Sequence, residues 1–105
     1  MGRVERGELQ IEFAETTLFE VAFTLERTYK QSKAQVAQYL SSFLSLPAVK
    51  FPEPRRALLA LDVFERSNID FGDAYLAALA LESDGEVISF DRDFDSIPGV
   101  TRIQP

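Results

Sequence analysis

Three aspartates alternate near the carboxyl end of the chain, at Asp91, Asp93 and Asp95. They follow a short apolar run, residues 87–90, which begins after an Asp-Gly turn and is typical of a buried strand. In open α/β sheets, ligands bind at the edge formed by the carboxyl ends of the strands. Carboxylates this close repel one another. They must therefore be screened by water in an exposed turn, or by a hard divalent cation in a binding site.

Asp73 is a further acidic candidate, at the start of an alanine-rich helix predicted over residues 71–83. Its spacing to Leu76 and Ala77 places the carboxylate on the buried face of that helix, where it needs compensation. A purely structural interpretation has Asp70 cap the helix and Asp73 complete a capping box, since acids in a first turn also suit the helix dipole. Both interpretations remain open at this point.

Glu20 has the same ambiguity, because Thr17 and Glu20 have the spacing of a capping box. Topology relates these acids to one another. Glu20 and Asp73 are predicted in the first turns of helices, and Asp91 at the end of a strand. In a parallel α/β sheet these positions share one edge, so the three acids can converge into a magnesium site.

Such a site has a defined chemistry. Two hard cations can activate a water and stabilise the leaving oxygen in phosphodiester cleavage without histidine or cysteine. The predicted catalytic residues and metal ligands are Glu20, Asp73 and Asp91, with Glu20 acting directly or through water. Asp93 is a further candidate ligand.

Three neighbours complete the set of candidates. Asp95, like Asp93, is expected to hold a ligand in place. Ser89 either orients a ligand or is an ordinary sheet residue. Arg92 either contacts phosphate or neutralises the acids beside it.

The composition limits this chemistry further. The chain has no cysteine and no histidine, which excludes disulfides, thiolate or imidazole metal sites, and imidazole catalysis. Any metal must be held by oxygen, which favours Mg²⁺ or Mn²⁺. The net charge of −6 argues against binding nucleic acid by broad phosphate neutralisation. It permits an enzyme that meets a phosphodiester through metal ions.

The length of 105 residues predicts one domain, residues 1–105. No apolar run approaches the ~20 residues of a membrane span, and the amino terminus has no apolar signal-peptide core, so a cytoplasmic location is expected. Strands and helices alternate, which predicts an α/β fold with a mostly parallel sheet. The predicted strands cover residues 9–14, 49–51, 86–90 and 100–103. The predicted helices begin near Thr17, at a Ser32 capping box, at Pro54 and at Phe71.

Three blocks of the sequence together resemble a PIN domain of the VapC toxin type: TTLFEVAFTL (16–25), IDFGDAYLAA (69–78) and VISFDRDF (87–94). The resemblance covers nearly the whole chain. It implies a three-layer α/β/α fold and a metal-dependent ribonuclease that is usually dimeric and is neutralised by a cognate antitoxin. Glu20, Asp73 and Asp91 match the second, third and fourth acidic positions of the family.

The chain departs from the family at its start. Family members open with a central strand that ends in Asp-x-Asn, followed by a helix, and this chain begins after both. Glu5 and Glu8 do not replace the missing aspartate. Losing that strand would leave neighbouring ladder groups unpaired. We therefore expect either a closed-up sheet, with the Leu9 or the Glu86 strand in the gap, or pairing with another copy, and we expect impaired catalysis.

Two other functions compete with the ribonuclease. The first is a non-catalytic interaction domain that binds an antitoxin or itself, which magnesium binding at Asp73 and Asp91 would distinguish. The second takes residues 87–93 as the strand and D-x-D of a haloacid-dehalogenase-type phosphotransferase. That motif belongs near the start of its domain and needs a downstream lysine, and no lysine follows Lys50.

Overall fold

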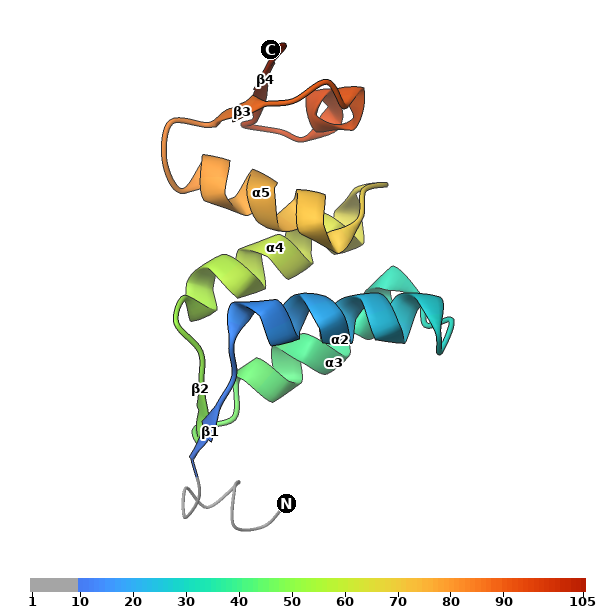
Figure 1. The fold of residues 1–105 in the computed structure, drawn as a ribbon, viewed down its shortest axis with the longest axis vertical. Coiled ribbons are helices and arrows are strands. Elements are labelled where there is room, and N and C mark those ends of the chain that lie inside the picture. The colour runs from blue at the N-terminus through green and yellow to red at the C-terminus, as the bar shows by residue number, and fades with distance from the viewer. Residues whose placement is uncertain (1–9) are drawn as a thin grey trace. The chain divides into compact units, whose positions relative to one another are not determined.

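The computed structural model describes residues 10–105. By their contacts, the residues divide into two compact units, Met1–Pro54 and Arg55–Pro105 (Figure 1). The described part contains four α-helices and two pairs of short parallel strands, which confirms the predicted α/β class and the parallel pairing. No helix within it is long and apolar enough to cross a membrane.

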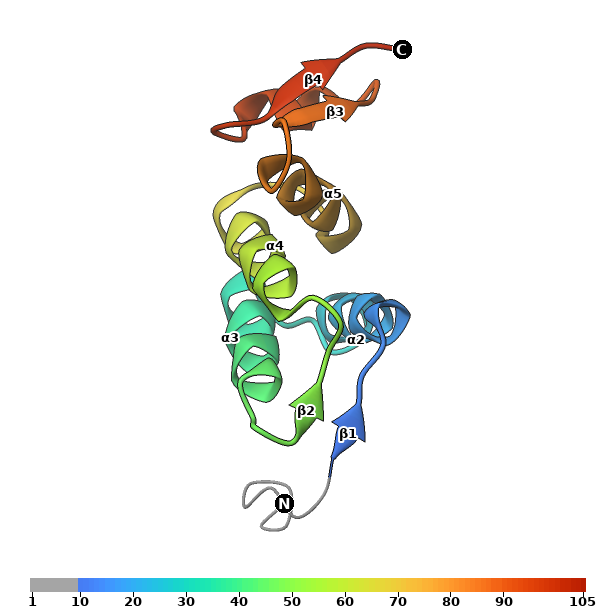
Figure 2. The same ribbon diagram turned by 90° about the vertical axis from the view of Figure 1, so that its left-hand side faces the viewer.

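The first unit contains one strand pair and two helices. Strand β1 (Ile11–Glu12) lies parallel to β2 (Val49–Lys50), as Figure 2 shows, and the pair is accompanied by α2 (Glu15–Arg27) and α3 (Lys33–Leu44). The core of this unit consists of apolar side chains from both helices: Leu18, Ala22, Val36 and Leu40. The predicted strand at Leu9 lies partly outside the described residues.

Helix α3 begins where the sequence predicts. The Ser32 hydroxyl accepts a hydrogen bond from the Gln35 N–H (3.1 Å), and the Gln35 side chain accepts one from the Ser32 N–H (2.9 Å). This capping box satisfies two backbone donors that the helix itself leaves unpaired. The predicted Ser32 start is therefore confirmed.

The second unit places the acids of interest. It contains α4 (Pro54–Arg66), α5 (Phe71–Leu81), β3 (Glu86–Ile88), the 3₁₀ helix η1 (Arg92–Ser96) and β4 (Thr101–Ile103). Strands β3 and β4 are parallel and α5 packs against β3, while η1 lies within the crossover beside β4 (Figure 1). The core is built from three fully buried phenylalanines and the alanine face of α5: Phe64, Phe71, Phe94, Ala74, Ala77 and Ala78.

The strands do not form the expected closed-up sheet. Among residues 10–105, β1 pairs with β2 and β3 pairs with β4, which leaves two separate two-stranded ladders. Each strand is only two or three residues long, and each ladder joins strands of the same unit. In the described part of the chain, the Glu86 strand, β3, pairs with β4 alone. Pairing with another copy remains a prediction.

Gly85, between α5 and β3, gives a first testable prediction. Its φ is +80°, and a Cβ at this position would lie 2.7 Å from the Gly99 carbonyl oxygen. We expect Gly85→Ala to lower the free energy of unfolding by roughly 1–3 kcal/mol, because of the left-handed backbone and the backbone clash. Urea unfolding followed by circular dichroism measures this. Glu86→Ala, at the exposed neighbouring position, should stay within about 0.5 kcal/mol. Equal stability of the two variants would contradict the prediction.

Candidate metal site

The amino end of α5 is capped by Asp70. The Asp70 carboxylate accepts a hydrogen bond from the Asp73 N–H (2.8 Å), and the Asp70 carbonyl accepts one from the Ala74 N–H (3.0 Å). This confirms the structural role predicted for Asp70. Within the described residues the return bond of a capping box, from the Asp70 N–H to the Asp73 carboxylate, is not formed. Capping therefore explains Asp70, whereas the half-buried Asp73 carboxylate makes no capping bond and only its place in the first turn suits the helix dipole.

The alternating aspartates follow β3 in a compact turn. The Ser89 N–H donates to the Ile103 carbonyl (3.0 Å), which extends the β3–β4 ladder by one bond. The Ser89 hydroxyl then accepts from the Asp91 N–H (3.0 Å), and the Asp91 carboxylate accepts from the Asp93 N–H (2.9 Å) and caps η1. We call residues Ser89–Asp93 the acidic turn. Ser89 thus positions the backbone of Asp91, and the predicted loop contains a 3₁₀ helix.

The carboxylates of α5 and the acidic turn influence one another. Burial raises the pKa of Asp73 above its ordinary value, and the charges of Asp70, Asp91 and Asp93 raise it further, in that order. Asp91 and Asp93 are therefore close enough to Asp73 to act on it across the interface between α5 and β3. The predicted convergence of these acids at one sheet edge remains a prediction.

Asp95 lies apart in function from the other two alternating aspartates. Its carboxylate forms a bidentate ion pair with Arg102 of β4. The distances are 3.0 Å from Nε to Oδ1 and 3.3 Å from Nη2 to Oδ2. The same guanidinium donates to the Ser89 carbonyl (3.2 Å). The sequence pattern did not predict this role for Arg102. An arginine in the middle of the predicted strand 100–103 is the feature that could have indicated it. Arg92 is exposed at the start of η1.

The position of Glu20 corrects the sequence prediction. Helix α2 begins at Glu15 after Ala14, which forms no side-chain cap, so Thr17 does not open a capping box and Glu20 lies in the second turn rather than the first. The earlier start is supported by the Leu18 N–H, which donates to the Ala14 carbonyl (3.1 Å), and by Glu15, whose charge suits the helix dipole. The Glu20 side chain is exposed in the first unit.

The donor set of the second unit suits a hard cation. Within the described residues, no three acidic side chains come together closely enough to hold a metal ion among themselves. Mg²⁺ rarely needs such a cage, because it keeps several waters and is commonly bound through one or two carboxylates plus substrate phosphates. Asp73 and Asp91 are candidates for that pair, and a bound cation would offset the burial and the like charges that raise the pKa of Asp73.

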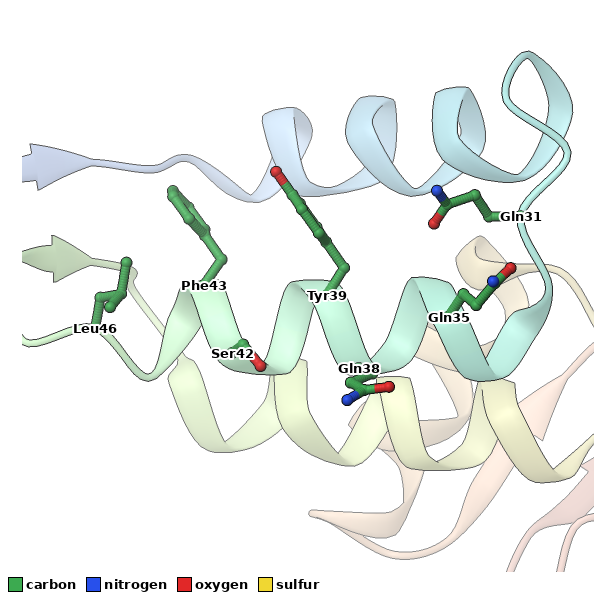
Figure 3. A pocket seen from close by; sticks show the side chains of 7 residues that line it. All are labelled: Gln31, Gln35, Gln38, Tyr39, Ser42, Phe43 and Leu46. Atoms are coloured by element: carbon green, nitrogen blue, oxygen red, sulfur yellow. The ribbon is translucent and has the colours of Figure 1, made fainter. Parts of the chain in front are cut away.

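A pocket of about 520 Å³ in the first unit has a different character. Figure 3 shows Tyr39 and Phe43 projecting from the same side of α3, with Gln31 and Gln35 nearer its amino end. The lining contains glutamines, a serine, two aromatic rings and a leucine, and no carboxylate. It therefore offers volume but no carboxylate ligand for a hard cation.

These features define a class of protein: an α/β protein whose acidic residues gather at the carboxyl end of a parallel strand pair and can bind a metal only through oxygen. The sequence pattern of the PIN domain matches residues 5–100, so the chain belongs to the PIN domain family. No curated protein and no solved structure is significantly similar to it. PIN domains typically use divalent metal ions, and membership indicates a nuclease-type function.

The raised pKa of Asp73 predicts a pH dependence of stability. The folded chain holds the Asp73 proton more tightly than the unfolded chain does, so stability falls as pH rises from the ordinary value of 3.8 through the raised folded pKa. Asp73→Asn removes this ionisation, and we expect it to be more stable than the wild type at neutral pH, with the difference vanishing below the ordinary pKa. Urea unfolding at several pH values measures it.

The matched control is Asp62→Asn. Asp62 forms a surface ion pair with Arg66, 3.1 Å from Nε to Oδ1, so its removal brings no comparable relief of repulsion. An Asp73→Asn variant less stable than the wild type at neutral pH would show that the Asp73 charge is stabilising, against the prediction.

Proposed function

We propose that this chain is a PIN-type, metal-dependent endoribonuclease of the toxin class, acting in the cytoplasm. The observation that supports it most directly is the half-buried Asp73 in the first turn of α5, whose pKa is raised by burial and then by the charges of Asp70, Asp91 and Asp93. A cluster of like charges with partial burial is stable only at a cost, and such clusters gather at functional sites. Family membership adds the nuclease class.

In this proposal Asp73 and Asp91 bind Mg²⁺ or Mn²⁺. Asp93 either binds the ion as well or forms a hydrogen bond to one of its ligands. The bound ion would activate a water and stabilise the leaving oxygen of the phosphodiester. Asp73 must lose its proton to act as a ligand, so metal affinity should fall as pH is lowered. Arg92 is exposed beside Asp91, and in this proposal it contacts a phosphate of the RNA. Glu20, in the first unit, remains a predicted ligand.

The proposal includes low activity for this chain by itself. Each carboxylate missing from a metal site weakens binding, and no three acids of residues 10–105 gather around one ion position. We therefore expect weak Mg²⁺ binding and slow cleavage rather than rapid turnover.

Magnesium calorimetry on the 105-residue chain, with an RNA cleavage assay on the same samples, tests this function. The expected result is saturable Mg²⁺ binding together with cleavage that stops on addition of a chelator. Cleavage that continues in the chelator would contradict a metal mechanism. An absence of Mg²⁺ binding would contradict the ribonuclease.

A non-catalytic interaction domain is the second candidate, and one observation favours it. Ile88 and Phe90 are 70% and 72% exposed at the end of β3, and Ile103, the register partner of Ile88, is 40% exposed. Exposed apolar side chains gathered in this way are typical of interaction surfaces. An antitoxin protein or a second copy of the chain is the proposed partner. If the chain does not bind Mg²⁺, light scattering tests this second function. A molecular mass above that of one chain would show self-association.

A further inference from the structure

Arg102 contacts both sides of the acidic turn. It lies in the middle of β4, opposite Val87 in the ladder, and its side chain is only 13% exposed. One edge of the guanidinium holds Asp95, which follows the turn, through two hydrogen bonds of 3.0 and 3.3 Å. Its remaining nitrogen, Nη1, donates to the carbonyl of Ser89, which begins the turn (3.2 Å).

From Ser89 the contacts continue to the two acids. The Ser89 hydroxyl accepts from the Asp91 N–H (3.0 Å), and the Asp91 carboxylate accepts from the Asp93 N–H (2.9 Å). A displacement of Ser89 or Asp95 would therefore move the Asp91 carboxylate relative to Asp73. Two kinds of bond tie the turn to β4: the backbone bond from the Ser89 N–H to the Ile103 carbonyl, and the side-chain bonds of Arg102.

We propose that Arg102 is the positioning residue of the site, and that it sets the placement of the Asp91 carboxylate for metal binding. The inference rests on the proposed function. Arginine suits this role because its planar fork makes two parallel bonds to a carboxylate while a third nitrogen reaches a carbonyl. A lysine carries the same charge and cannot reproduce that geometry.

Two substitutions separate positioning from simple electrostatics. Arg102→Met removes a positive charge near the acids, so Coulomb forces alone would make Mg²⁺ bind more tightly, whereas loss of positioning makes it bind more weakly. Arg102→Lys keeps the charge and loses the fork, so electrostatics predicts no change and positioning predicts weaker binding. We expect affinity to fall about 10- to 100-fold in Arg102→Met, as for other residues that orient metal ligands, and less in Arg102→Lys.

Amide hydrogen exchange gives a readout that does not involve the metal. The Asp91 and Asp93 N–H groups should exchange faster in Arg102→Met, while the Ala77 N–H, inside α5, should keep its wild-type rate. Arg66→Met is the control, because Arg66 forms an exposed ion pair within α4 and touches no part of the turn. Asp95→Asn, which weakens the same clamp, serves if Arg102→Met does not fold.

The outcomes distinguish the two proposals. Wild-type binding of Mg²⁺ with unchanged or tighter binding in both Arg102 variants would overturn the positioning role and leave the ribonuclease intact. If the wild type binds no Mg²⁺, the ribonuclease fails, and unchanged exchange at Asp91 and Asp93 in the variants would overturn the positioning role as well.

Discussion

Asp91→Asn is expected to abolish measurable Mg²⁺ binding and metal-dependent RNA cleavage while the chain stays folded. The loss of affinity should be at least about 100-fold, since even residues that only orient a ligand contribute 10- to 100-fold. The variant keeps the fold because the asparagine side-chain carbonyl can still accept the hydrogen bond that the Asp93 N–H donates to Asp91. Only the charge is lost.

Stability distinguishes loss of the site from loss of the fold in this experiment. The Asp91 charge raises the pKa of Asp73, so its removal relieves repulsion and the variant should be as stable as the wild type or slightly more stable at neutral pH. Asp62→Asn, purified in the same way, controls for contaminating ribonuclease and for a general effect of lost charge. Equal cleavage by the Asp91→Asn and wild-type samples would rule out Asp91 as a ligand.

Phe71→Ala is expected to be the most destabilising of the substitutions considered, at about 3–5 kcal/mol. Phe71 is fully buried, and its ring meets Phe64 edge to face at 5.8 Å and Tyr75 at 6.1 Å. Truncation loses this burial and leaves a cavity between α4 and α5. Folded domains have only about 5–15 kcal/mol of stability. The Phe71→Ala variant should therefore be close to unfolding even without denaturant.

Urea and thermal unfolding followed by far-ultraviolet circular dichroism measure the effect of Phe71→Ala. Phe90→Ala is the matched control in the same unit, because the Phe90 ring is exposed and its removal should change stability by no more than about 0.5 kcal/mol. A Phe71→Ala variant as stable as Phe90→Ala would show that the α4–α5 interface does not carry the stability of the second unit.

The local structure was largely readable from the sequence. The Ser32 capping box, Pro54 in the first turn of α4 and Asp70 at the cap of α5 all act within a few residues of themselves, so their types and spacing suffice to predict them. Alternation of strands with helices was likewise enough for the α/β class, because short parallel strands need crossovers. The same rule predicts that Asp73 and Asp91 lie at one edge.

Other features depended on partners distant in the chain. The pairing of Arg102 with Asp95 and Ser89 follows from the register of β3 on β4, which spacing along the sequence does not specify. Helix α2 begins at Glu15, before the predicted Thr17, with the Leu18 N–H bonded to the Ala14 carbonyl, and no side-chain cap marks that start in the sequence. The division of the strands into two pairs was likewise decided by packing within each unit. The sequence by itself determined which residues carry the acidic chemistry, because side-chain type is local. Only the tertiary structure decided which of them act on one another, because charges interact through space.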